Sequence, residues 1–452
     1  MRILGKTMKA VILFAAVAFV TGGTWADEWT DPDTGYTWTY RIDADGAKIQ
    51  KNSKSPAVSP TPTGDIIVPA VLGGKPVRRI GDGAFYWCNE ITSIVLPDSV
   101  TSIGASSFFW CASLSNVNIP NGVTSIGSSA FSGSGLVDIS IPASVTKIYD
   151  KAFYECHELV KVSILSKEIN FGDRVFDFCR RIQDVTICAC KISEIFPKSY
   201  QSITNVAICE STTKIEDSMF MECESLSNVT IPDSVTSIGV EAFYGCHALA
   251  NIFIPDSVTN ISGGAFAYCK NLTSISIPNS VTSIGSSAFS GCSGLTSVTI
   301  PDSVTSIGNH AFSYCSELTS ITIPDNVASI GTSAFSGCNG LTNITIPSSV
   351  KNIGEGVFNS CTNLESITVA ENNDSFSSAN GLLLSKDGKK LIHGVNGNVT
   401  IPDGVTYISA AAFVGCSGLT SVKIPQSVTS IAENAFGMCD GLVSVYISDL
   451  AA

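Results

Sequence analysis

The sequence predicts a repeat solenoid built mainly of β-strands, and three observations lead to this prediction. A proline recurs every 23 residues, apolar residues between the prolines have the spacing of short strands, and a cysteine returns at one fixed position. The prolines in register are Pro97 and Pro120, then Pro232, Pro255, Pro278, Pro301, Pro324 and Pro347, and finally Pro402 and Pro425. A fixed period in this range indicates a stacked array of identical units.

One unit, LTSVTIPDSVTSIGNHAFSYC at residues 295–315, shows the expected elements in order. Its first apolar residues predict a short strand with one face turned inward, and Pro301 ends that strand because proline cannot donate to a ladder. Val304 and Ile307 predict a second, shorter inward strand. After the bend at Gly308, the Ala-Phe pair predicts one helical turn that closes the core.

A single coil cannot bury these residues, so neighbouring coils must stack as parallel strands about 4.8 Å apart. We expect about 17 such coils over residues 65–452. Two departures are expected, in irregular coils at 166–209 and in a hairpin insertion at 371–398 that turns at Asp387 and Gly388. Residues 27–64 predict a hairpin cap turning at Asp45 and Gly46, followed by a Pro/Ser/Thr-rich linker.

Residues 1–26 have the pattern of a secretory signal peptide. Basic residues precede a short apolar run from Ala10 to Val20, and small side chains at Thr24 and Ala26 indicate cleavage after Ala26. The run is too short for a membrane span, which needs about 20 residues. We therefore expect an exported chain, secreted or at the cell surface, whose mature form has no membrane span.

Composition narrows the class of partner. The chain is 44% hydrophobic, which excludes general disorder, and only 14% charged. The net charge of −13, with no basic run, argues against nucleic acid because phosphate affinity comes from clustered cations.

The strings IPDSVTSIG and AFSGC, repeated in this register, resemble the BspA-like class of leucine-rich repeats. The resemblance covers most of the chain and implies a leucine-rich-repeat type parallel sheet. For function it implies adhesion to host or matrix proteins and to other cells, and it supplies no catalytic residues. The chain departs from the pattern at 166–209, and it stops directly after the strand VYISDLAA, so either it is a fragment or a partner covers that strand.

Thirteen of the sixteen cysteines lie three residues after the Phe and should form a buried column of small apolar plugs. A column on one axis does not bring metal ligands together from several directions, so we expect no zinc site. Cys188 and Cys209 instead replace the strand-ending proline in adjacent coils. Their Cα atoms should be about 5 Å apart, which predicts a Cys188–Cys209 disulfide with Cys190 as the rival partner.

The sequence offers no catalytic residues, metal ligands or cofactor motif. His157 and His247 follow cysteines of the column, but that position belongs to a turn. Asp follows the repeat proline in several coils, and turn chemistry explains it more simply than calcium does. An extracellular hydrolase would need paired carboxylates or a nucleophile in a cleft, and neither is evident. We expect a protein that is not an enzyme.

The outward side of the sheet is the expected binding surface. The residue four positions before each proline position is almost always Ser or Asn, and the residue two positions before it is most often Thr. The exception is the run Asp138, Lys161 and Asp184 in three successive coils, close in sequence to Arg180 and Arg181. These five residues are the candidate binding residues. The alternative is a solvated ladder of ion pairs with no ligand.

Two further functions are open at this point. The leading hypothesis is a secreted or surface-exposed protein that binds an extracellular protein or glycoconjugate weakly at many repeated points, with avidity supplying strength. The alternative is a structural spacer that presents a domain or anchor beyond residue 452. The ligand and the oligomeric state are not indicated.

Overall fold

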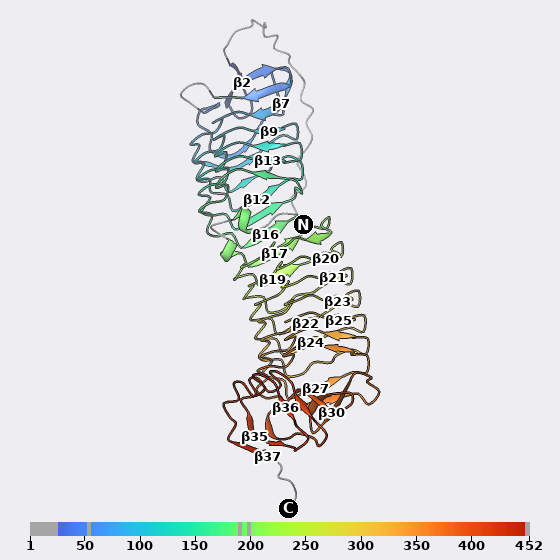
Figure 1. Cartoon of the computed structure of the whole chain (residues 1–452). Coiled ribbons are helices and arrows are strands. Elements are labelled where there is room, and N and C mark those ends of the chain that lie inside the picture. Colours follow the sequence, from blue (N-terminus) through green and yellow to red (C-terminus); the bar gives the residue numbers. More distant parts are fainter. Residues whose placement is uncertain (1–25, 52–55, 189–191, 197–199, 448–452) are drawn as a thin grey trace, which may run out of the picture. The chain divides into compact units, whose positions relative to one another are not determined.

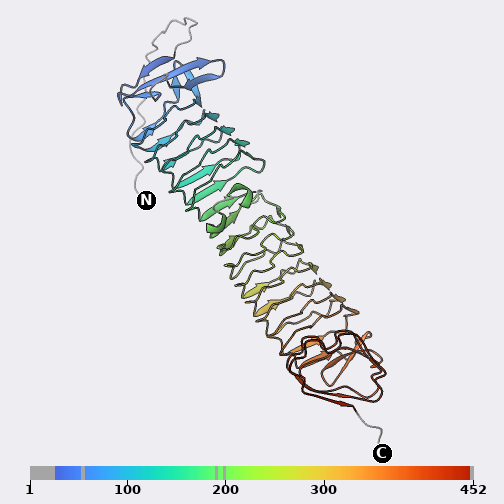
Figure 2. The ribbon, with the colours of Figure 1, turned by 60° about the vertical axis from the view of Figure 1, so that its left-hand side comes forward.

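The computed structural model describes residues 26–51, 56–188, 192–196 and 200–447. The predicted signal peptide, residues 1–26, lies outside these ranges except for its last residue, Ala26. Two compact units divide the chain. Unit 1 holds Met1–Glu158 and Ile169–Val175, and unit 2 holds Leu159–Glu168 and Phe176–Ala452. Within each unit the chain winds in successive coils whose strands lie side by side (Figures 1 and 2).

Unit 1 opens with an antiparallel cap. β1 (Asp27–Thr30) pairs with β2 (Thr37–Asp43), and β2 turns back into β3 (Gly46–Ile49). Trp38 of β2 is only 1% exposed. β3 then pairs in parallel with the strand of the first coil, so the cap closes the end of the stack and supplies its first parallel neighbour.

The remaining strands of unit 1 belong to the cap's edge and to the coils. They are β4 (Val58–Ser59), β5 (Gly64–Ile67), β6 (Val71–Leu72), β7 (Lys75–Ile80), β8 (Ile91–Val95), β9 (Ser102–Ile103), β10 (Asn116–Val117), β11 (Ser125–Ile126), β12 (Asp138–Ile141), β13 (Lys147–Ile148) and β15 (Asn170–Phe171). β5, β8 and β10 form one parallel sheet. β7, β9, β11, β13 and β15 form a second along another side of the coils.

Unit 2 has the same two sides. Its longer strands are β14 (Lys161–Ile164), β16 (Asp184–Ile187), β17 (Asn205–Ile208), β19 (Asn228–Thr230), β22 (Ser274–Ser276), β24 (Ser297–Thr299), β27 (Asn343–Ile346), β29 (Ser366–Val369), β33 (Gly397–Thr400), β35 (Leu419–Ile424) and β37 (Ser444–Ile447). Its short second strands are β18 (Lys214–Ile215), β20 (Ser237–Ile238), β21 (Asn260–Ile261), β23 (Ser283–Ile284), β25 (Ser306–Ile307), β26 (Ser329–Ile330), β28 (Asn352–Ile353), β34 (Tyr407–Ile408) and β36 (Ser430–Ile431).

The strand register follows the sequence period. Ser274 lies opposite Ser297 on the first side, and Ser306 lies opposite Ser329 on the second, each pair one 23-residue repeat apart. The predicted β-solenoid with a parallel sheet is therefore confirmed, with about 16 turns where the sequence indicated about 17. Because the pairing is parallel and in register, each position of the repeat forms a column along the coils of each unit.

The core is built from such columns. Phe243, Phe266, Phe289 and Phe312 are each fully buried and stack ring on ring, with centroids 5.2 to 5.5 Å apart. Each such side chain contributes about 1.5–3 kcal/mol through burial. The predicted inward residues Val304 and Ile307 are at most 2% exposed.

The segment around Phe312 differs from the helical turn that the sequence predicts. Its N–H groups bond alternately within the coil and to the next coil. Ala311 and Ser313 donate to carbonyls three residues back, whereas His310 and Phe312 donate to Thr332 and Ala334 of the following coil. Among the described residues, helix occurs only at α1 (Ile192–Ile195) and η1 (Tyr200–Ser202), both in the irregular coils. Stacking thus replaces helical bonds with bonds between coils.

This turn requires left-handed backbone two residues before and two residues after the Phe. His310 and Tyr314 have φ values of 55° and 59°, and in other coils glycine stands at the second position, as Gly291 does with φ 72°. Glycine also makes room there. A Cβ on Gly291 would lie 2.7 Å from the Tyr268 ring of the preceding coil. Tyrosine and glycine alternate at this position in four successive coils, as Tyr268, Gly291, Tyr314 and Gly337.

We predict that Gly291→Ala destabilises unit 2 by about 2 kcal/mol or more, because it adds both left-handed strain and a clash with Tyr268. Gly388→Ala is the matched control, since Gly388 has φ 67° but no atom lies within 4 Å of the place that a Cβ would occupy. It should cost only the strain, about 1 kcal/mol. Urea unfolding measures both, and equal losses at the two positions would contradict the packing role of Gly291.

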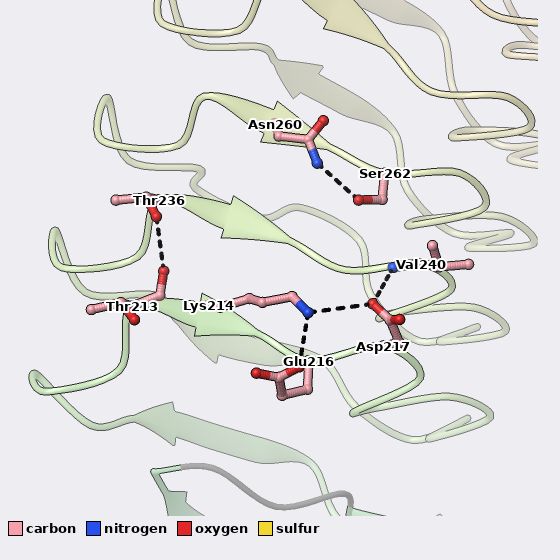
Figure 3. A network of polar contacts seen from close by, with 8 residues as sticks. All are labelled: Thr213, Lys214, Glu216, Asp217, Thr236, Val240, Asn260 and Ser262. Atoms are coloured by element: carbon pink, nitrogen blue, oxygen red, sulfur yellow. Dashed lines mark hydrogen bonds and ion pairs between the residues drawn. The ribbon is translucent and has the colours of Figure 1, made fainter.

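Hydroxyl groups on the second side are used to join coils. Thr236 donates its Oγ1 hydrogen to the carbonyl of Thr213 at 3.1 Å, and the Asp217 carboxylate accepts from the Val240 N–H at 3.0 Å (Figure 3). At the turn after the proline, Ser303 donates to the Val281 carbonyl at 2.6 Å. The same bonds recur from coil to coil, so the repeated Ser and Thr residues at these positions have a structural task.

The cysteine column has a similar task. Cys315 donates its thiol hydrogen to the Phe289 carbonyl of the preceding coil at 3.2 Å, and eight further cysteines make the equivalent bond. Twelve of the thirteen are buried, as the sequence predicts. The cysteines of the column therefore fill the core and also form hydrogen bonds between coils, whereas the sequence predicts only apolar packing.

The predicted insertion is a meander of β30 (Phe376–Ala379), β31 (Leu382–Ser385) and β32 (Lys390–His393), all antiparallel. Buried amides bind it to the regular coils. Asn373 donates to the carbonyls of Pro347 and Val350, and Asn396 donates to the carbonyl of Cys361. Each amide replaces coil-to-coil bonds that the interrupted period no longer provides.

His393 at the end of β32 is buried against Phe358, edge to face with centroids 5.5 Å apart. Its Nδ1 is 2.7 Å from the Gly394 carbonyl oxygen, while its Nε2 has no partner among the described residues. Burial lowers the pKa of His393 to about 4, against the smaller opposing effect of the Gly394 carbonyl. The side chain is therefore neutral at pH 7.

We predict that unit 2 loses stability as the pH falls from about 6.5 toward 4. The pKa of His393 is lower in the folded state, so the unfolded state takes up the proton first and the loss approaches about 3 kcal/mol. In His393→Phe the difference between the free energies of unfolding at pH 7 and pH 4.5 should shrink. An unchanged pH dependence in that variant would show that His393 does not control it.

Candidate binding surface

The outward positions of the longer strands in unit 2, together with the equivalent positions of the segments 251–253 and 320–322, which are not strands, form two columns that we call the outer sheet face. Strand alternation exposes them, as in β22 and β24, where the middle residue is buried and its two neighbours are exposed. The first column comprises Lys161, Asp184, Asn205, Asn228, Asn251, Ser274, Ser297, Ser320, Asn343, Ser366, Asn398, Ser421 and Ser444. The second comprises Ser163, Thr186, Ala207, Thr230, Phe253, Ser276, Thr299, Thr322, Thr345, Thr368, Thr400, Lys423 and Tyr446.

Three residues of the first column form a chain of hydrogen bonds across successive strands. Asn205 donates from Nδ2 to Asp184 Oδ1 at 2.6 Å, and Asn228 donates from Nδ2 to Asn205 Oδ1 at 2.8 Å. The second Nδ2 hydrogen of each amide is also bonded, to Thr204 Oγ1 and Ser227 Oγ respectively. These contacts fix the orientation of both amides on the surface.

The structure brings together some of the predicted binding residues. Lys161 and Asp184 lie directly opposite one another in β14 and β16. Arg180 and Arg181 are exposed in the turn before β16, and the Arg180 guanidinium lies 5.8 Å from the Phe178 ring centroid. Asp138 is exposed in β12 of unit 1. Asp184 therefore accepts a hydrogen bond from Asn205 on one side and lies opposite Lys161 on the other.

Phe253 interrupts the second column. It is 74% exposed, while Ile252 and Ile254 on either side are buried, so its ring stands on the outer sheet face. The repeat places Thr230 and Ser276 at the same position of the preceding and following coils. The sequence marks Phe253 as an exception to the Thr column, but only its exposure identifies it as a surface feature.

A second exposed aromatic cluster lies in unit 1. Tyr86 stacks on Phe109 with centroids 5.1 Å apart, and Trp87 stacks on Trp110 at 5.8 Å. Trp87 is 52% exposed and Trp110 40%. The predicted binding residues do not include this cluster, although the strings FYWC and FFWC in adjacent coils could have revealed it.

Cys188 and Cys209 form a disulfide with a Cα–Cα distance of 4.8 Å. This is the pair that the repeat register predicts. The two cysteines follow β16 and β17 directly, where other coils have the strand-ending proline. The rival partner, Cys190, lies outside the described residues. The bridge joins two adjacent irregular coils beside the amide chain.

The column cysteines are poorly suited to nucleophilic chemistry. Burial raises the pKa of Cys292 to about 12 and raises that of Cys246 well above its ordinary value. The reactive form is the thiolate, so these thiols are inert at neutral pH. His247 follows Cys246, but its half-exposed side chain lies beside a carboxylate of the preceding coil, with Nδ1 3.9 Å from Glu224 Oε1.

Comparison with protein families identifies the class of protein. The family described as the BspA-type leucine-rich repeat region matches residues 78–202, 191–316, 283–380 and 396–451, in six copies. These ranges cover well over half of the sequence, so the chain belongs to the BspA-type leucine-rich repeat family. No curated protein matches it significantly. No helix in the described ranges has both the length and the apolar character needed to span a bilayer.

Several solved structures are similar to the chain. A leucine-rich repeat protein from Bacteroides ovatus is 25% identical over 95% of this chain and 100% of its own, with a TM-score of 0.44. A leucine rich cell surface protein from Faecalibacterium prausnitzii is 27% identical over 94% and 95%, with a TM-score of 0.32. The pneumococcal vaccine antigen PcpA is 16% identical over 95% and 100%, with a TM-score of 0.32.

We predict that the double variant Cys188→Ala, Cys209→Ala is about 3 kcal/mol less stable than the parent chain, because the bridge closes a loop with a sequence separation of 21. Urea unfolding of the oxidised protein measures the loss. Cys292→Ala is the control for removal of a buried cysteine that is not bridged. Peptide mapping without reduction should recover the Cys188–Cys209 pair, and free thiols at both positions would refute the bridge.

Proposed function

We propose that this chain is a secreted or surface-exposed protein that binds extracellular proteins or glycoconjugates through the outer sheet face and carries out no catalysis. The observation behind this proposal is the contrast between the two sides of the coil. Hydroxyl groups of the second side bond to the adjacent coil, as Thr236 and Thr305 do. On the outer sheet face, Ser274, Ser297 and Thr299 have no protein partner among the described residues.

These surface hydroxyls have the properties of a repeated weak binding site. They are exposed, they stand on regularly spaced strands, and their donors and acceptors are available to a ligand. A partner that spans several coils would engage several equivalent positions, and its apparent affinity would then exceed that of a single contact by a large factor. A long uniform face suits adhesion to an extended polymer better than capture of one small molecule.

Export is supported by two features of the chain. The first residues have the pattern of a signal peptide, with a basic start, a short apolar run and small residues before Asp27. The Cys188–Cys209 disulfide suits an oxidising compartment. The inert column thiols and the repeat family support a binding role without catalysis.

The proposal is tested by solid-phase binding of residues 27–452 to matrix proteins and mucins, with Ser297→Arg as the blocking variant. A long charged side chain at Ser297 should reduce binding severalfold by obstructing the outer sheet face. Ser286→Arg is the matched control, since Ser286 is exposed on the other side of the same stack. No binding by the parent chain, or equal binding by both variants, would contradict the proposed face.

A further inference from the structure

We propose that the part of the outer sheet face from Asp184 to Phe253 is a binding site for a neutral glycan. We call this part the amide stripe, comprising Asp184, Asn205, Asn228, Asn251 and Phe253. The inference rests on the proposed function, which supplies the binding face, and it adds the position of the specific site and the chemical class of the ligand.

Phe253 stands exposed on the outer sheet face. Burial of a phenylalanine side chain is worth about 1.5–3 kcal/mol, and this one remains 74% exposed. Its equivalents in neighbouring coils are the short side chains of Thr230 and Ser276, which do not cover the ring. Phe253 therefore presents an apolar plane on an otherwise hydroxyl-bearing surface, and such a plane packs well against the C–H face of a pyranose ring.

The polar atoms of the amide stripe that remain available to a ligand are mainly hydrogen-bond acceptors. Both Nδ2 hydrogens of Asn205 and of Asn228 are already donated to other side chains. The polar atoms that remain unbonded at the two ends of the row Asp184, Asn205 and Asn228 are therefore acceptors. These are the second carboxylate oxygen of Asp184 and Oδ1 of Asn228, neither of which has a protein partner among the described residues. The next residue in the column, Asn251, is exposed and makes no side-chain hydrogen bond within the described part of the chain.

Acceptors held in fixed positions select a ligand that is rich in hydroxyl donors. Because the orienting bonds between Asp184, Asn205 and Asn228 already exist without ligand, binding does not need to order these side chains. A carbohydrate offers both hydroxyl donors and apolar C–H faces, which is the combination that the acceptors and Phe253 require. A polypeptide ligand would instead favour several aromatic or Arg contacts, and this stripe contains one aromatic ring.

The amide stripe carries no net charge together with its neighbour Lys161. Lys161 lies directly opposite Asp184, so the two formal charges at the end of the stripe cancel. Asn205, Asn228 and Asn251 are uncharged. A sulfated or sialylated glycan would find no compensating cationic row along these residues, whereas a neutral glycan avoids the cost of desolvating a charge. The stripe thus favours neutral sugars.

The test measures binding of soluble neutral hexasaccharides of glucose, mannose, xylose and N-acetylglucosamine to the full mature chain by calorimetry. Bacterial expression keeps Asn228, which lies in an Asn-Val-Thr sequence, free of glycosylation. Phe253→Thr restores the residue found in neighbouring coils and should weaken binding by about tenfold, which corresponds to 1.4 kcal/mol. Asn228→Leu should weaken it by a similar factor through loss of the acceptor.

Tyr446→Thr is the matched control, because Tyr446 is an exposed aromatic in the same column of the last strand, β37, and is 59% exposed. Binding that falls in Phe253→Thr and persists in Tyr446→Thr supports the site. Binding that is unchanged in Phe253→Thr overturns it.

Mucin before and after removal of its glycans separates this inference from the proposed function. Loss of binding after deglycosylation, together with loss in Phe253→Thr, supports both. Binding to deglycosylated mucin or to matrix proteins that disappears in Ser297→Arg, with no binding to any hexasaccharide, overturns the glycan site and leaves the proposed function standing. No binding to any probe overturns both.

Discussion

The structure depends on one constraint: each coil must supply hydrogen-bonding partners to the coils before and after it in a fixed 23-residue register. Parallel strands meet this need on two sides. On the third, the alternating bonds around Phe312 meet it without a helix. The thiol of Cys315 and the hydroxyl of Ser303 supply further bonds to the preceding coil. The monotony of the sequence follows, since a residue that satisfies the neighbour in one coil satisfies it in the next.

The same constraint indicates where the sequence is free to vary. The outward side chains of the longer strands do not supply the backbone-directed hydrogen bonds that join the coils. Residues of the outer sheet face can therefore be substituted without weakening the stacking of the coils. Phe253 and the chain from Asp184 to Asn228 are such changes. The irregular coils and the insertion are larger departures, and each carries its own replacement for the missing bonds, the disulfide in one and the buried amides of Asn373 and Asn396 in the other.

Sequence alone was sufficient for the parallel solenoid, the buried cysteine column and the pairing of Cys188 with Cys209, because each depends only on register. The conformation of the turn around Phe312 was not predictable, because the Ala-Phe pair of a single repeat is compatible with one helical turn. The hydrogen bonds that replace the helical ones go to the next coil, which a single repeat does not reveal. The buried His393 and the buried amides were missed because the insertion breaks the period that locates everything else. Phe253 was visible as an exception, but the amide chain beside it depends on side-chain orientations that spacing does not give.

Repeated serines at the proline turn hold the coils together, whereas Ser274, Ser297 and Ser320 of the outer sheet face make no side-chain hydrogen bond within the described residues and are free for a ligand. Urea unfolding of two triple variants tests it most directly. Replacement of Ser257, Ser280 and Ser303 by Ala removes three bonds to preceding coils, and replacement of Ser274, Ser297 and Ser320 removes three surface hydroxyls. We expect the first variant to lose about 3 kcal/mol of unfolding free energy and the second almost none. Equal losses in the two variants would contradict it.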